Sequence, residues 1–119
     1  MKILCVDDDE DIAILLDNVL SANEHIVTIC NNGVDALSLI EKENFNLILL
    51  DLQMPGLSGK DVLDSLEKNG LIEQNNIVIL SAENLDKLEI LEFMKKGIKE
   101  ILQKPIRLER LLEVVKIFE

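Results

Sequence analysis

The most restrictive feature of this 119-residue sequence is a regular alternation of short apolar runs with longer amphipathic segments. The short runs occupy residues 2–6, 25–30, 45–50, 76–80 and 99–102. The first, third and fourth runs consist mostly of Ile, Leu, Val and Cys, which is typical of strands that are covered on both faces. The pattern therefore predicts a sheet of five strands whose central members are fully buried.

The segments between these runs carry apolar residues at intervals of three and four, which is the spacing of one helix face. The five faces are Ile12, Leu15, Leu16, Val19 and Leu20; Val34, Leu37 and Ile40; Val62, Leu63 and Leu66; Leu85, Leu88 and Leu91; and Leu108, Leu111, Leu112, Val115 and Phe118. Five successive strand–helix units favour an α/β fold with a parallel sheet, helices on both faces and right-handed crossovers.

The charge balance excludes several classes of partner. Lys and Arg total 12 and Asp and Glu total 23, so the formal net charge is −11. Contacts to nucleic acid phosphates need clustered cations, and anionic membrane surfaces need them too, so neither is expected as a direct partner. No apolar run approaches the roughly 18 residues of a membrane span, and the apolar N-terminus is too short for a signal peptide. A cytoplasmic location is the resulting expectation.

Chemically active side chains follow four of the predicted strands. Asp7 and Asp8 come after the first strand, Asp51 after the third, Ser81 after the fourth and Lys104 after the fifth. In open parallel sheets, ligands bind beyond the carboxyl ends of the strands, because these ends share one edge. We therefore expect the three carboxylates, the hydroxyl and the ammonium group to converge there.

Crowded carboxylates repel one another, and a hard cation such as Mg²⁺ relieves the repulsion. Asp7, Asp8 and Asp51 are thus candidate metal ligands. A carboxylate such as Asp51 is also a candidate nucleophile toward phosphorus, with Lys104 and Ser81 stabilising the phosphoryl oxygens. The alternatives are helix capping by Asp7 and Asp8 and an ordinary turn role for Asp51.

Four motifs then occur in a fixed order along the chain. They are Val6-Asp7-Asp8, residues 51–59 (Asp-Leu-Gln-Met-Pro-Gly-Leu-Ser-Gly), Ser81-Ala82 and Lys104-Pro105. Together they resemble the receiver domain of two-component response regulators, of which the chemotaxis receiver is a single-domain example. The resemblance covers the whole chain and implies a single receiver domain over residues 1–119. It also implies a flavodoxin-like fold of five βα units, with strand order 2-1-3-4-5.

The resemblance implies a role for each site residue. Asp51 would be the phosphoacceptor, Lys104 would pair with the phosphoryl oxygens, and Ser81 would turn inward to bond them. The Mg²⁺ ligands would be Asp7 (through water), Asp8, Asp51 and the backbone carbonyl of Gln53. The peptide bond between Lys104 and Pro105 is often cis in this family.

The implied function is a phosphorylation-dependent signalling switch. A sensor histidine kinase, a phosphotransfer protein or a small acyl phosphate would donate the phosphoryl group. The face formed by the fourth helix, fifth strand and fifth helix would then control a downstream protein or a fused effector, or form a homodimer. Catalysis would be limited to the domain's own phosphoryl transfer and dephosphorylation.

One departure from the family pattern leaves a second interpretation of the function. Receivers commonly carry Tyr or Phe three residues before the lysine, and this chain has Ile101 there. The alternative is a pseudo-receiver, which acts as an interaction module without phosphorylation. A third reading, a phosphatase of small molecules, is disfavoured because Gln53 stands where such enzymes place a second Asp.

Three residues outside these motifs carry structural expectations. Cys5 and Cys30 lie in apolar runs and are expected to be buried and reduced. His25, the only histidine, is expected to be a solvated loop residue.

Overall fold

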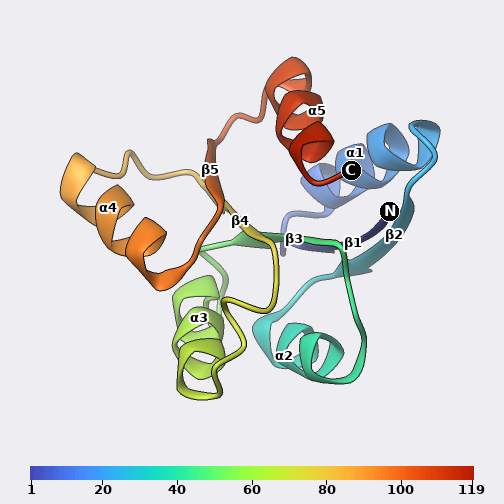
Figure 1. Ribbon diagram of the computed structural model, residues 1–119. Coiled ribbons are helices and arrows are strands. Elements are labelled where there is room, and N and C mark those ends of the chain that lie inside the picture. Colours follow the sequence, from blue (N-terminus) through green and yellow to red (C-terminus); the bar gives the residue numbers. More distant parts are fainter.

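Strands and helices alternate along the whole chain in the computed structural model, which describes residues 1–119 (Figure 1). The strands are β1 (Lys2–Val6), β2 (Ile26–Cys30), β3 (Leu47–Asp51), β4 (Ile77–Ser81) and β5 (Glu100–Gln103). The helices are α1 (Glu10–Ala22), α2 (Gly33–Lys42), α3 (Gly59–Lys68), α4 (Lys87–Lys96) and α5 (Leu108–Ile117). All strand pairs are parallel and the order is β2-β1-β3-β4-β5, which confirms the predicted fold class.

The sheet separates two apolar cores. Helices α1 and α5 cover one face, α2 and α3 cover the other, and α4 lies toward the β5 edge (Figure 1). Successive side chains of a strand point to opposite faces, so Leu49 joins the core under α1 and α5 while Leu50 joins the core under α2 and α3. Every residue of β3 and β4 is buried, as the continuous apolar runs predict.

Side chains at the helix ends satisfy backbone groups that the helices leave free. Asp9 caps α1 by accepting hydrogen bonds from the backbone N–H groups of Asp11 and Ile12. Ser58 and Asp61 form a reciprocal capping box at the start of α3. None of the five helices combines the length and the apolar character needed to cross a bilayer.

The predicted apolar face of α4 is wrong. Asp86 caps α4, so Leu85 precedes the helix, and Leu88 and Leu91 are 67% and 57% exposed. The side of α4 that approaches the core carries Phe93, which packs against the core under α2 and α3. The helix has two apolar rows and lies at the edge of the sheet, where only one row is covered, and periodicity does not tell which.

The expectation for His25 is also wrong, because its side chain is only 5% exposed. Its Nδ1 lies 3.0 Å from the terminal amine of Met1, and its Nε2 lies 3.2 Å from Oε1 of Glu119. The chain reverses direction at Glu24, whose φ of 69° is left-handed, and this turn precedes His25 as the chain enters β2.

Both cysteines are buried and unpaired, as expected. Burial raises the pKa of the Cys5 thiol to about 12, so this thiol stays protonated.

Candidate functional site

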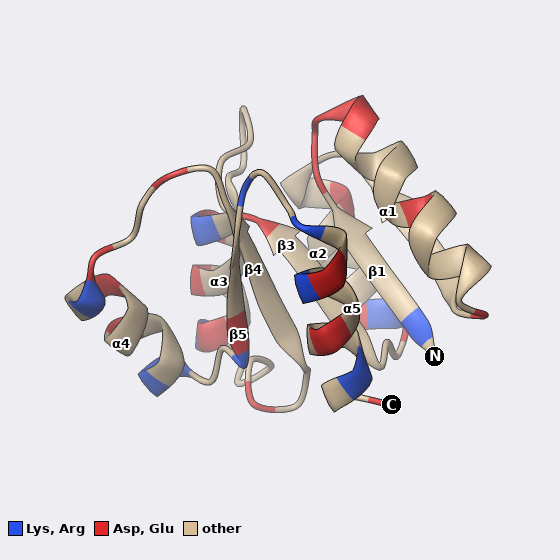
Figure 2. Ribbon diagram, turned by 90° about the horizontal axis from the view of Figure 1, so that it is seen from above, with Lys and Arg blue, Asp and Glu red and all other residues tan.

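The carboxyl ends of four strands deliver polar side chains to one place. Asp51 is the last residue of β3 and Ser81 the last of β4, while Asp7 and Lys104 follow β1 and β5 directly. Asp7, Asp51 and Ser81 are each at most 1% exposed. Figure 2 shows the acidic residues at the start of α1 and the basic residues in the connection between β5 and α5. The expected convergence is present for the carboxylates and the ammonium group, while the Ser81 hydroxyl bonds to Glu83.

Lys104 joins two of the carboxylates. Its Nζ lies 2.9 Å from Oδ2 of Asp7 and 3.3 Å from Oδ2 of Asp51. Charges buried this deeply are costly unless they are paired, and here one ammonium group serves two carboxylates. The site keeps an excess of negative charge.

That excess perturbs the ionisation of the site. The pKa of Asp51 is raised to about 6, because burial and the charge of Asp7 outweigh Lys104 and a 3.2 Å hydrogen bond from the N–H of Gln53. Burial lowers the pKa of Lys104, but the bonds and charges of Asp7 and Asp51 outweigh burial, so the net shift is upward. Lys104 is therefore a permanent cation at neutral pH.

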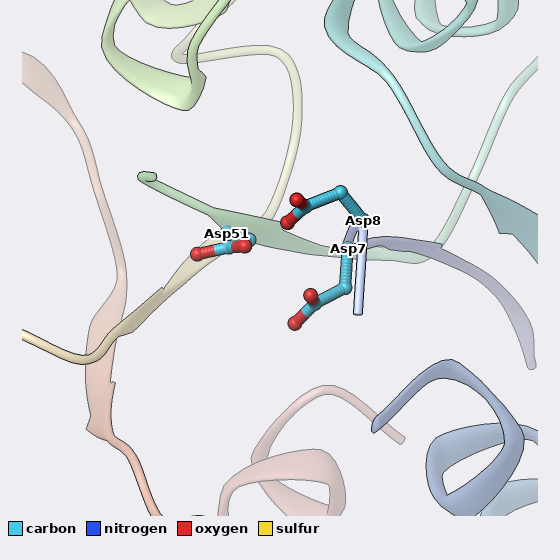
Figure 3. Close-up of side chains that lie close together, drawn as sticks. All are labelled: Asp7, Asp8 and Asp51. Carbon is cyan, nitrogen blue, oxygen red and sulfur yellow. The ribbon is translucent and has the colours of Figure 1, made fainter. Parts of the chain in front are cut away.

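The carboxylates of Asp7, Asp8 and Asp51 form a group that suits a hard cation. Each offers one oxygen, and these oxygens lie within 4.8 Å of one another (Figure 3). Asp8 is exposed, so the group opens to solvent on that side. Oxygen ligands with room for water match the preference of Mg²⁺, so the donor set fits this ion.

Ser81 ends strand β4 as predicted, but its hydroxyl forms its hydrogen bonds away from Asp51. Its hydroxyl donates to the carbonyl of Glu83 at 3.0 Å and accepts from the N–H of Glu83 at 3.2 Å. Ser81 lies two residues after Ile79, whose side chain belongs to the core under α2 and α3. The hydroxyl is thus held in the β4–α4 connection, and it makes no hydrogen bond with Asp51.

Two features of the site were not anticipated from the sequence. A Cβ on Gly59 would lie 2.1 Å from the carbonyl oxygen of Asp51, so the first turn of α3 packs directly on the backbone of that residue. The side chain of Gln53 accepts a hydrogen bond from the N–H of Ala82 at 3.3 Å, which links the β3–α3 and β4–α4 connections. A glycine as the first residue of a helix is a weak signal for the first feature, since Gly is a poor helix former.

Comparisons with known proteins agree with this geometry. The family model described as the response regulator receiver domain matches residues 3–116. The transcriptional regulatory protein YkoG of Bacillus subtilis, itself uncharacterised, is 36% identical over 112 residues, covering 92% of this chain and 47% of YkoG. The two-component response regulator ARR14 of Arabidopsis thaliana is 32% identical over 116 residues, covering 96% of this chain and 30% of ARR14. The chain spans less than half the length of these relatives.

Solved structures show the same fold. The receiver domain of the Francisella response regulator 1452 aligns with a TM-score of 0.88 and 32% identity, covering 98% of this chain and 94% of that one. The BeF₃-activated DrrB receiver domain aligns with a TM-score of 0.81 and 26% identity, covering 98% and 95% of the two chains. Fold, site and sequence agree, and the chain belongs to the family of response regulator receiver domains of two-component systems.

Proposed function

We propose that residues 1–119 form one receiver domain that switches when Asp51 is phosphorylated. A carboxylate oxygen of Asp51 attacks the phosphorus of a phosphohistidine on a sensor kinase or phosphotransfer protein, or of a small acyl phosphate. The bond from phosphorus to the donor breaks, and its electron pair leaves with the donor. The observation that carries the proposal is the buried contact of Lys104 with both Asp7 and Asp51, at 2.9 and 3.3 Å.

In this proposal, Lys104 and the oxygen ligands around Asp51 have different electrostatic roles. Lys104 remains charged and stabilises the phosphoryl oxygens as they approach Asp51. Asp7, Asp8, Asp51 and the Gln53 carbonyl are the proposed ligands of Mg²⁺, which supplies positive charge against the negative charge of the phosphoryl group. Attack of water on the acyl phosphate would reset the switch, so the proposed catalysis ends with the domain's own dephosphorylation.

The proposed response begins at Ser81. Its hydroxyl gives up the bonds to Glu83 and donates to a phosphoryl oxygen, which draws the β4–α4 connection toward the site. Helix α4 follows at low cost, since none of its residues is buried. Because Leu88 and Leu91 are exposed on α4, the face of α4, β5 and α5 is the proposed contact for a downstream protein, a fused effector or a second copy.

The test is phosphorylation by acetyl phosphate, read as the mass of the intact protein. With Mg²⁺, the wild-type protein is expected to gain one phosphoryl group, and a chelator is expected to prevent the gain. Asp51→Asn should abolish the gain. Asp9→Asn is the matched control: Asp9 is exposed and caps α1, and Asn is an equally good cap, so labelling should persist. Labelling that survives Asp51→Asn would remove Asp51 as the acceptor.

A second candidate function rests on Ile101. This half-buried residue packs against the core under α2 and α3, where the family commonly has an aromatic ring. A pseudo-receiver would use the same fold for protein contacts alone and would not need Mg²⁺. Titration calorimetry with Mg²⁺ separates the two, because a phosphorylated switch requires binding and a pseudo-receiver does not.

A further inference from the structure

The chain contains two Asn-Gly pairs, Asn32-Gly33 and Asn69-Gly70. This dipeptide is the sequence most open to spontaneous deamidation, because glycine has no side chain to shield its backbone nitrogen. The nitrogen must approach the side-chain carbonyl carbon of the asparagine, and the backbone between them must be free to turn. The fold therefore decides whether either pair reacts.

The fold holds Asn32 in place on several sides. Its Oδ1 accepts from the N–H of Asp35 at 2.8 Å as the cap of α2, and its Nδ2 donates to Oδ2 of Asp35 at 2.8 Å and to Oδ1 of Asn31 at 2.9 Å. Gly33 is buried, and a Cβ there would lie 2.4 Å from the carbonyl oxygen of Leu57. Ring closure at Asn32 would have to break the cap and separate α2 from the β3–α3 connection.

Asn69 is in the opposite situation. It follows the last turn of α3, and both Asn69 and Gly70 are exposed. Asn23 and Asn75 each donate a side-chain hydrogen bond to a carbonyl four residues earlier, whereas the Asn69 side chain forms no such bond. The space around Gly70 is open, and its N–H donates to the carbonyl of Glu67 at 3.1 Å, beside a 2.8 Å bond from the N–H of Leu71 to the carbonyl of Leu66 that closes the helix end. Ring closure at Asn69 would disturb this turn, but it would break no side-chain cap and displace nothing packed on Gly70.

We propose that Asn69 is a site of spontaneous deamidation in the folded protein and that Asn32 is protected. The nitrogen of Gly70, losing its proton, attacks Cγ of Asn69, and the side-chain amide leaves as ammonia. The resulting succinimide takes up water. Opening at the Cγ bond gives aspartate, and opening at the backbone carbonyl bond gives isoaspartate, in which the chain runs through the former side chain.

The product would place a new negative charge at the carboxyl end of α3, where the helix dipole is already negative. This end lies one helix length, about 15 Å, from the first turn that packs on Asp51. The modification therefore leaves the phosphoryl site intact, and the inference stands whether or not Asp51 is the acceptor.

The experiment follows both sites in one sample. The whole protein is kept in mildly alkaline buffer and digested with pepsin at acidic pH, where ring closure is slow. Mass spectrometry then follows the gain of about one dalton in the peptides that carry Asn32 and Asn69. Isoaspartate is confirmed by methylation with an isoaspartyl methyltransferase. Asn69→Gln serves as the matched variant, because glutamine would have to close a larger, slower ring.

In the folded protein, the Asn69 peptide is expected to convert at least about tenfold faster than the Asn32 peptide. In urea, the two identical dipeptides should convert at rates within about threefold of each other, because the protection of Asn32 is structural. Asn69→Gln should remove the methylation signal of the folded protein. Equal rates in the folded protein, faster conversion of Asn32, or conversion of Asn69 only in urea would each overturn the proposal.

Discussion

Gly59→Ala tests whether the backbone contact between α3 and Asp51 fixes the site. Alanine is ordinarily the better helix residue, and the replacement would be expected to gain up to about 1 kcal/mol. Here the new Cβ would lie 2.1 Å from the carbonyl oxygen of Asp51 and 2.7 Å from Cα of Leu52. Both neighbours are backbone atoms, so no side-chain rotation relieves the clash.

The magnitude follows from the distance. Ordinary contacts of a Cβ begin near 3.4 Å, so α3 and the end of β3 must separate by about 1.3 Å, the difference between 3.4 and 2.1 Å. Overpacking of this kind typically costs about 1–3 kcal/mol. After the helix gain of up to about 1 kcal/mol is subtracted from the middle of that range, we expect a net loss of about 1 kcal/mol in the free energy of unfolding, which lowers the urea midpoint by about 0.5 M. The displaced Asp51 should also be phosphorylated more slowly by acetyl phosphate.

Far-ultraviolet circular dichroism is the appropriate assay, because the chain has no Trp or Tyr for fluorescence. Gly33→Ala is the matched variant: its Cβ would clash with a carbonyl oxygen at 2.4 Å, but that oxygen belongs to Leu57 and not to Asp51. We expect both variants to lose stability and Gly59→Ala to lose more of the phosphorylation rate. A Gly59→Ala protein with an unchanged or higher urea midpoint would refute the reasoning.

Three further predictions concern charge and exposure. Without Mg²⁺, Asp51→Asn should stabilise the protein at pH 7 by about 3 kcal/mol, because the pKa of Asp51 is about 6 in the folded state against 3.8 ordinarily and each pKa unit is worth about 1.4 kcal/mol. This gain should fade as the pH drops from 6 toward 4, and equal urea-midpoint gains at pH 7 and pH 4 would contradict it. Lys104→Met should tighten Mg²⁺ binding several-fold in calorimetry, since it removes an ammonium 2.9 Å from Asp7 and 3.3 Å from Asp51; weaker binding would count against the site. The double variant Leu88→Ser, Leu91→Ser should change the free energy of unfolding by less than about 0.5 kcal/mol, and a larger loss in urea titration would mean that these leucines are packed.

The parallel sheet could be predicted from the sequence for a physical reason, whereas its strand order followed from the resemblance to receiver domains. Strands such as β3 and β4 are buried on both faces, so they appear in the sequence as short, nearly continuous apolar runs between amphipathic segments. The convergence of Asp7, Asp51 and Lys104 follows from the same topology, because parallel strands end at a common edge.

The features that were not predicted depend on particular contacts, distant or local, that composition and periodicity do not reveal. The burial of His25 is set by Met1 and Glu119, which lie at the two ends of the chain. The approach of Gly59 to the Asp51 backbone has no signature beyond the residue itself. The orientation of the Ser81 hydroxyl is decided by the local turn to Glu83, which composition does not reveal.

The two apolar rows of α4 have a mechanical consequence. Leu88 and Leu91 lie two positions before Ile90 and Phe93, and two residues turn an α-helix by about 200°, so the rows stand on nearly opposite sides. Rotation of the helix about its own axis would turn Leu88 and Leu91 toward the sheet in place of Ile90 and Phe93. The sequence of α4 therefore offers the sheet an apolar row in either of two orientations of the helix about its axis.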